Sequence, residues 1–246
     1  MRIIAISPHL DDAAFSVGAT LAALAEAGHE VTVVTCFTRS MPDPTGFALA
    51  CQTDKGLGPE VDYMAIRRAE DEAAMAVLGA APLHLDLPEA PHRGYSSATK
   101  LFAGPHPGDE VWRELASALH ELSGDLWLAP QGLGGHVDHL QVLRTMVRLT
   151  RPTLWWRDSP YVLRDPAARP GRELPSGLSE CELPQDRDHR ADACACYVTQ
   201  LGFQFGGADQ MRTALADRSE PLLADERAQQ VLNWLRPAFA GARLGT

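Results

Sequence analysis

Two short segments of the sequence, 8–12 (Pro-His-Leu-Asp-Asp) and 135–139 (Gly-His-Val-Asp-His), concentrate imidazole and carboxylate groups. Catalytic zinc sites use three protein ligands, commonly imidazole nitrogens and carboxylate oxygens, and keep a further position for water. His9, Asp12 and His139 supply such a ligand set. A metal ion held there would lower the pKa of a bound water and polarise a carbonyl group. The two segments therefore predict a metal-dependent hydrolase.

The carboxylates beside these ligands have two explanations. Asp11 could accept a proton as a general base, and Asp138 could orient a metal-binding histidine through a hydrogen bond. Either residue could instead cap a helix, because an aspartate at a helix N-terminus accepts backbone N–H groups and meets the positive end of the helix dipole. Two such segments at the same edge of a sheet favour the metal site.

Alternating strand and helix patterns bring the two segments to the same edge. Apolar runs predict strands at 2–7, 30–37, 83–87, 125–130 and 153–157. Apolar residues at helical spacing predict helices at 13–27, 64–78, 108–122, 137–149, 190–201 and 223–235. This order predicts an α/β fold, a Rossmann-like, mostly parallel open sheet with helices on both faces. Ligands bind such sheets at the carboxyl ends of the strands, where both segments lie.

The first strand-to-helix turn argues against a dinucleotide-binding protein. It reads His-Leu-Asp-Asp-Ala at 9–13 and lacks the glycine-rich loop that binds a pyrophosphate. Two carboxylates at this position would repel phosphate and attract a cation.

Composition narrows the class of protein further. A chain of 246 residues with 45% hydrophobic content is expected to form a single domain, 1–246, with a surface excursion or lid at about 158–188. Five scattered cysteines and the lack of a signal-peptide pattern or long apolar run predict a cytoplasmic protein without a membrane span. A net charge of −10 argues against nucleic acid as a partner. The sequence predicts no particular oligomeric state.

These motifs resemble those of the PIG-L/LmbE-like de-N-acetylases, whose signature is a His-Pro-Asp-Asp segment after the first strand and a later His-x-Asp-His segment. The corresponding segments are 9–12 and 136–139, and 66–79 resembles a third family block. The resemblance implies that His9, Asp12 and His139 bind zinc, with Fe²⁺ as another candidate. It further implies that Asp11 is the general base and that His136 stabilises the oxyanion in its protonated form or protonates the leaving amine.

The resemblance implies hydrolysis of an N-acetyl group on a small amino sugar or glycoconjugate. Arg67 is a candidate for binding a substrate hydroxyl or carboxylate, and His92 and Arg93 are candidates for contacting an anionic substrate. Two loops, 38–58 and 88–95, are expected to overhang the site.

Two other functions remain open on sequence grounds. The chain could be an amidase that cleaves a thiol conjugate on the same scaffold, or a non-catalytic sugar-binding module that retains the metal site. The presence of Asp11, which a metal does not need, weighs against the non-catalytic module.

One tyrosine found in some relatives is missing from its usual position in this sequence. Gly134 stands where some relatives have a mobile tyrosine, and Tyr95 and Tyr161 are possible substitutes.

Overall fold

A seven-stranded sheet forms the centre of the computed structural model, which describes residues 1–239. Its strands are β1 (Arg2–Ser7), β2 (Glu30–Thr35), β3 (Ala81–His84), β4 (Leu126–Pro130), β5 (Thr153–Trp156), β6 (Ser179–Cys181) and β7 (Leu222–Ala224). They lie in the order β3-β2-β1-β4-β5-β7-β6, in which β1 to β5 are parallel and β7 is antiparallel to both of its neighbours. The predicted α/β fold with a mostly parallel sheet is therefore confirmed. Residues 240–246 of the predicted domain lie outside the described part.

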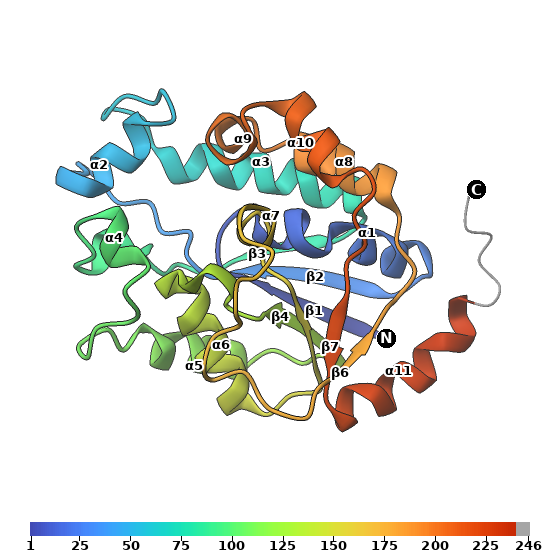
Figure 1. Ribbon diagram of the computed structural model, residues 1–246. Helices are drawn as coiled ribbons and strands as arrows, with labels where there is room; N and C mark the ends of the chain where they lie inside the picture. Colours follow the sequence, from blue (N-terminus) through green and yellow to red (C-terminus); the bar gives the residue numbers. More distant parts are fainter. Residues whose placement is uncertain (240–246) are drawn as a thin grey trace.

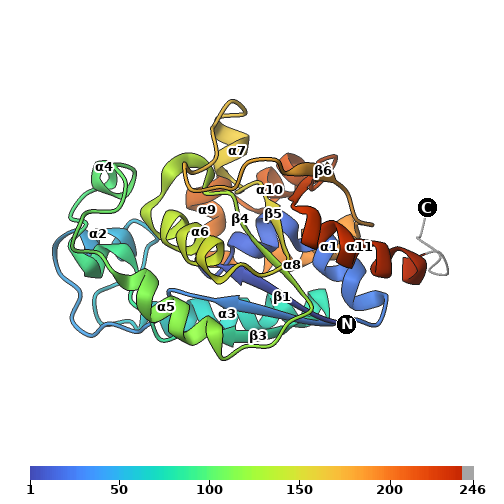
Figure 2. The same ribbon diagram turned by 90° about the horizontal axis from the view of Figure 1, so that it is seen from below.

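Helices cover both faces of this sheet (Figure 1; Figure 2). On one face, α1 (Asp12–Glu26), α3 (Tyr63–Leu78) and α8 (Arg187–Ala195) pack together, and on the other α5 (Val111–His120) packs against α6 (Val137–Leu149). The remaining helices are α2 (Gly46–Thr53), α4 (Ala98–Leu101), α7 (Tyr161–Arg164), α9 (Val198–Phe205), α10 (Ala208–Leu215), α11 (Glu226–Phe239) and two 3₁₀ turns, Ala90–Arg93 and Leu133–Gly135. The chain thus forms three layers, with the sheet in the middle.

The central strands read as nearly continuous apolar runs because both of their faces are covered. In β1, Ile3 and Ala5 contribute to the core beneath α1, whereas Ile4 and Ile6 contribute to the core beneath α5 and α6. Every residue of β4 is likewise buried. This burial fixes the register of β1 and β4, and with it the positions of the two segments that follow these strands.

The predicted boundaries of two helices were wrong. The helix expected at 190–201 is divided into α8 and α9, and between them lies the buried Tyr197, whose hydroxyl donates to Asp71 Oδ1 at 2.7 Å. The helix expected at 223–235 starts later, because Leu222–Ala224 forms β7. Asp225 then accepts a hydrogen bond from the Ala228 N–H at 2.8 Å at the start of α11. A short apolar run such as 222–224 does not distinguish a strand from a helix.

The segment 158–188, for which we predicted a surface excursion or lid, begins at the end of β5 and contains α7 and β6. The strand β6 pairs with β7 at the edge of the sheet. Across residues 1–239, no helix is both long and apolar enough to cross a membrane.

Candidate active site

The carboxyl ends of β1 and β4 bring His9, Asp12 and His139 together. His9 follows β1, Asp12 is the first residue of α1, and His139 lies in the first turn of α6. Asp12 Oδ2 lies 3.1 Å from His9 Nδ1 and 3.2 Å from His139 Nε2. Donor atoms that lie about 2.0–2.2 Å from one tetrahedral metal ion have separations of this size. The three residues are therefore arranged as a set of metal ligands would be.

A carboxylate binds the far nitrogen of each histidine. Asp138 Oδ2 lies 2.9 Å from His9 Nε2, and Asp158 Oδ1 lies 2.6 Å from His139 Nδ1. When these carboxylates accept the ring N–H groups, the lone pairs of His9 Nδ1 and His139 Nε2 face Asp12. These facing atoms repel one another unless a proton or a metal ion lies between them.

Burial and charge in this cluster indicate the same need for a cation. The Nε2 atom of His139 is buried and lies 3.2 Å from Asp12 Oδ2. Burial lowers the pKa of His139, but Asp12 and Asp158 outweigh it and raise the pKa to about 9. Burial raises the pKa of Asp12, yet the charges and hydrogen bonds of His139 and His9 hold it well below its usual range. Two imidazoles and one carboxylate in this environment fit Zn²⁺ or a similar divalent ion.

Asp11 lies beside the ligand set, immediately before α1. Its carboxylate is buried, and its Oδ1 lies 3.5 Å from Arg67 Nη2. Burial raises the pKa of Asp11 to about 7, while the Arg67 charge acts in the opposite direction. A carboxyl group with a pKa near neutrality can both accept and release a proton at physiological pH. Arg67 is itself held by Glu89, whose Oε1 lies 2.7 Å from Arg67 Nη1.

His136 caps α6 and faces the same space. Its Nδ1 accepts the backbone N–H of Asp138 at 3.2 Å, so Nε2 carries the ring proton. Burial lowers the pKa of His136 to about 3, which keeps the ring neutral. Ligand nitrogens of His9, His136 and His139 lie within 4.8 Å of one another, so His136 could also serve as a metal ligand.

Arg93 lies behind the histidines. Its Nη2 lies 2.7 Å from Asp138 Oδ1 and 3.0 Å from Asp109 Oδ2, and its Nη1 donates to the Pro88 carbonyl at 2.7 Å. We predicted that Arg93 contacts the substrate, but its guanidinium is fully engaged in this network and does not line the cleft. Through Asp138 it instead supports the position of His9.

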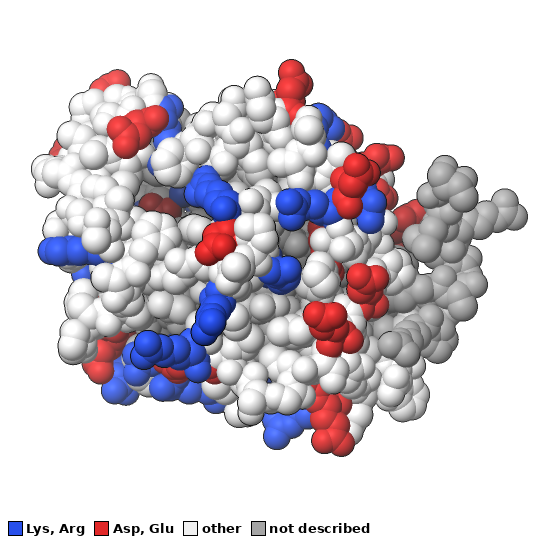
Figure 3. Space-filling view, in the orientation of Figure 1, with Lys and Arg blue, Asp and Glu red and all other residues white. Residues whose placement is uncertain are grey.

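An open cleft of about 300 Å³ leads to the ligand set. Its walls come from α2, α3, α4, α7, α9 and the loop at 88–95, so both predicted loops contribute to it. Figure 3 shows a recess with acidic and basic atoms inside it, on the side where α2 and α4 lie. Arg67 lines the cleft, whereas His92 lines a small neighbouring cavity, where burial lowers the pKa of its imidazole.

Tyr161 occupies the space that Gly134 leaves open. The φ angle of Gly134 is 82°, and a Cβ atom at this position would lie 2.6 Å from Tyr161 Cγ. The Tyr161 ring lines the cleft at 5.2 Å from the ring of His139. Tyr95, by contrast, donates its hydroxyl to Asp109 Oδ2 at 2.8 Å and is buried outside the cleft. Of the two candidate tyrosines, the structure therefore brings only Tyr161 to the site.

Three acidic residues of the site, Asp158, Glu89 and Asp109, were not predicted from the sequence. Asp158 follows β5, the strand next to β4, and its carboxylate reaches both His139 and the Leu133 N–H. Its place after a parallel strand was the available signal, because the carboxyl ends of such strands form the ligand-binding edge. Glu89 lies in the loop that follows the predicted strand 83–87 and carried the same signal, whereas Asp109 lies in a loop without it.

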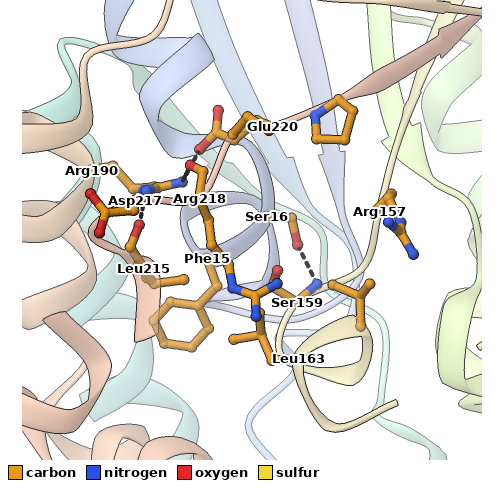
Figure 4. A pocket seen from close by; sticks show the side chains of 13 residues that line it. Phe15, Ser16, Arg157, Ser159, Leu163, Arg190, Leu215, Asp217, Arg218 and Glu220 are labelled. Atoms are coloured by element: carbon orange, nitrogen blue, oxygen red, sulfur yellow. Dashed lines mark hydrogen bonds and ion pairs between the residues drawn. The ribbon is translucent and has the colours of Figure 1, made fainter. Parts of the chain in front are cut away.

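A second cavity of about 280 Å³ is lined in part by Phe15 and Ser16 of α1 (Figure 4). Arg190 and Glu220 at its wall are both buried and form an ion pair of 3.1 Å. Oxygens of Glu220 also accept the backbone N–H groups of Ala19 and Thr20 at 2.9 and 2.7 Å. This cavity contains no cluster of histidines and carboxylates, and its central charges neutralise each other.

Comparison with known proteins identifies the family of this chain. The family model described as PIG-L, GlcNAc-PI de-N-acetylase, matches residues 4–150, which include the segments 8–12 and 135–139. The 2'-N-acetylparomamine deacetylase of Streptomyces fradiae is 35% identical over 170 residues, which are 65% of this chain and 57% of that protein. A 1D-myo-inositol 2-acetamido-2-deoxy-alpha-D-glucopyranoside deacetylase of Corynebacterium glutamicum is 30% identical over 146 residues, 57% of this chain and 49% of that protein.

The likeness extends to a solved structure. The crystal structure of the A40926 pseudoaglycone deacetylase is 31% identical with a TM-score of 0.71, and the match covers 91% of this chain and 96% of that chain. The matched regions span only about half the length of the two curated relatives. The family match nevertheless covers more than half of the chain and includes both motifs. The chain therefore belongs to the PIG-L family, described as GlcNAc-PI de-N-acetylase.

Proposed function

We propose that this protein is a metal-dependent hydrolase that removes an acetyl group from the nitrogen of an amino sugar or glycoconjugate. One observation carries the proposal: lone pairs of His9, Asp12 and His139 converge, and the buried carboxylate of Asp11 lies beside them. The converging lone pairs suit a metal ion, and the Asp11 carboxylate, which lies 3.5 Å from Arg67, lines the cleft beside them. Relatives named as deacetylases of N-acetylated sugars support the same reaction.

His9, Asp12 and His139 would hold the metal ion, with zinc as the first candidate and Fe²⁺ as the second. When bound, such an ion polarises a carbonyl oxygen and lowers the pKa of a water molecule. Asp138 and Asp158 fix the orientation of the two imidazoles, which raises the basicity of their ligand nitrogens. Arg93 holds Asp138 in turn.

Asp11 would accept the proton of the attacking water and later deliver it toward the leaving amine. Its buried position and its pKa of about 7 suit both transfers. Arg67 keeps the Asp11 side chain on the cleft side of α1 and presents its guanidinium to the cleft, where it can contact a sugar hydroxyl.

His136 would stabilise negative charge on the carbonyl oxygen through its Nε2–H. We predicted a protonated ring for this role, but the contact at Nδ1 and the pKa of about 3 favour a neutral donor. A neutral N–H group aimed at the place where charge develops stabilises an oxyanion without a proton transfer.

Acetate release tests this proposal. The zinc-loaded protein would be incubated with N-acetylglucosaminyl compounds and with the acetylated compounds named for the two curated relatives, and acetate would be measured by mass spectrometry. Asp11→Asn is expected to lower turnover by about 10²- to 10⁴-fold and to keep the metal. A matched control is Asp86→Asn, because the Asp86 carboxylate follows β3 and is 81% exposed.

Acetate release that Asp11→Asn leaves unchanged would contradict the role of Asp11. A metal-bound protein that releases no acetate from any compound would favour the amidase for thiol conjugates or the non-catalytic sugar-binding module. The cytoplasmic location and the lack of a nucleic-acid partner remain predictions.

A further inference from the structure

Lys55 is an unusual residue in the wall of the cleft. Only two of the 22 basic residues of the sequence are lysines, Lys55 and Lys100. Lys55 follows α2 within the loop at 38–58, and its Nζ donates to the Cys51 carbonyl at 2.7 Å. The same Nζ lies 4.9 Å from the centre of the Phe203 ring and 5.5 Å from that of Tyr63. The ammonium group is therefore held in place on the cleft side of the loop.

This ammonium group has no carboxylate partner within residues 1–239. The nearby Arg67 takes the carboxylates of Glu89 and Asp11. Burial lowers the pKa of Lys55, and the Arg67 charge lowers it further. A carbonyl and two aromatic faces offset part of the cost of removing the ammonium group from water. A negative charge that arrives with a ligand would offset the rest.

The wall around Lys55 is largely apolar. Phe47, Pro91 and Leu101 line the cleft together with Phe102 and Phe203, two aromatic residues that are 48% and 58% exposed. Exposed aromatic side chains at the rim of a cleft are typical of binding sites for flat or apolar groups. The groups close to the metal ligands, in contrast, are polar and charged. The cleft thus has a polar floor and a largely apolar wall, in which Lys55 is the one ammonium group beside the charged side chains of Asp54 and Arg164.

We propose that Lys55 and Phe203 form a subsite for a carboxylate on an aromatic aglycone, the part of the substrate that lies beyond the N-acetylated sugar. This inference rests on the proposed function, because it assumes that the sugar occupies the floor of the cleft. The aromatic body packs on the rim, and the carboxylate accepts hydrogen bonds from the Lys55 ammonium group. A cationic aglycone would be repelled at the same place.

A purely structural role for Lys55 makes a different prediction. Its hydrogen bond to Cys51 ties the loop to the end of α2, so removal of the ammonium group would weaken the loop. Such a change would reduce turnover of every substrate by the same factor, whatever its charge. A subsite for an anion instead predicts an effect that depends on the charge of the aglycone.

Three synthetic glycosides of N-acetylglucosamine separate these possibilities. They carry para-carboxyphenyl, para-carbamoylphenyl and para-aminomethylphenyl aglycones and are prepared as both anomers. Wild type is expected to prefer the carboxylate to the carbamoyl compound by about tenfold in kcat/KM, mainly through KM. Lys55→Met should bring this ratio close to one and change kcat on the carbamoyl compound by less than about twofold.

Two further variants serve as controls. Lys55→Arg keeps a positive charge and should retain part of the preference for the carboxylate. Lys100→Met removes the other lysine, which is exposed on α4, and should retain all of it. Equal losses on all three glycosides in Lys55→Met, or an unchanged preference, would overturn the proposal.

The subsite and the proposed function can fail separately. If none of the glycosides is hydrolysed, calorimetric binding of the same three compounds to the zinc-loaded protein still measures the preference. A preference for the carboxylate that disappears in Lys55→Met would support the subsite even though the reaction assignment had failed. Binding without such a preference would overturn the subsite.

Discussion

Two buried charged clusters flank α1, and they differ in what their charges face. In the cavity of Figure 4, the Arg190 guanidinium faces the Glu220 carboxylate at 3.1 Å, so opposite charges neutralise each other. In the cleft, the lone pairs of His9, Asp12 and His139 face one another across 3.1 and 3.2 Å. The first cluster needs no added charge. The second needs a cation, a proton or a metal ion, between its facing atoms.

The carboxylates in the two clusters also bind different kinds of groups. Glu220 accepts hydrogen bonds from the backbone of α1 and from the Thr20 hydroxyl, so its contacts tie the β7 side of the molecule to α1. Asp138 and Asp158 bind ring nitrogens and turn the opposite nitrogens toward a common point. Burial and charge are common to both clusters. The direction in which the lone pairs point separates a structural ion pair from a candidate metal site.

The largest expected effect comes from Asp12→Ala in the cleft. This change removes one of the three ligands, so the bound metal and nearly all turnover should be lost. The loss should exceed the roughly 100-fold cost in metal affinity that removal of a supporting carboxylate can cause. Metal content by plasma mass spectrometry and acetate release would measure both. Metal retained at one ion per chain would contradict the ligand set and direct attention to His136.

Glu220→Ala tests whether the Arg190–Glu220 ion pair has a purely structural role. It leaves the buried Arg190 without its carboxylate, and such changes cost about 3–5 kcal/mol in the free energy of unfolding. Denaturant titration would measure this loss, while metal content and turnover per folded molecule should stay near those of wild type.

A double variant provides the control for Glu220→Ala. Arg190→Met with Glu220→Met replaces both charges with apolar groups and should recover most of the lost stability. If the single variant instead lost its metal at full stability, the two clusters would not be independent, and the distinction between them would fail.

The parts of the site that the sequence predicts lie within contiguous motifs. The segments 8–12 and 135–139 each follow a strand that is buried on both faces, and parallel pairing of β1 with β4 brings their ends together. Strand and helix periodicity was sufficient to predict this, because it depends on local patterns and on the geometry of a parallel sheet.

The positions of the other site residues depend on packing between residues that are distant in the sequence. Lys55 lies in the loop after α2 and Phe203 lies in α9. No local sequence pattern predicts a contact between such distant residues. Arg93 was a candidate for contacting an anionic substrate because of its charge and its loop, and no local pattern predicts that Asp109 and Asp138 hold its guanidinium in the interior. Asp158 follows the parallel strand β5, but no motif in the sequence pairs it with His139. Its importance follows from the distance of 2.6 Å to His139.

The smallest of these effects is expected for Asp158→Asn. Asn keeps one oxygen, which can accept the His139 N–H in place of Oδ1, but it places an NH2 group opposite the Leu133 N–H and removes the negative charge, so metal affinity should fall by about 10- to 100-fold. Competition with a chelator would measure this affinity, and excess zinc should restore turnover. If affinity is unchanged and only stability falls, then Asp158 supports the loop through Leu133 rather than the metal through His139. In that case its carboxylate would resemble Glu220, which completes a structural contact, more than Asp138.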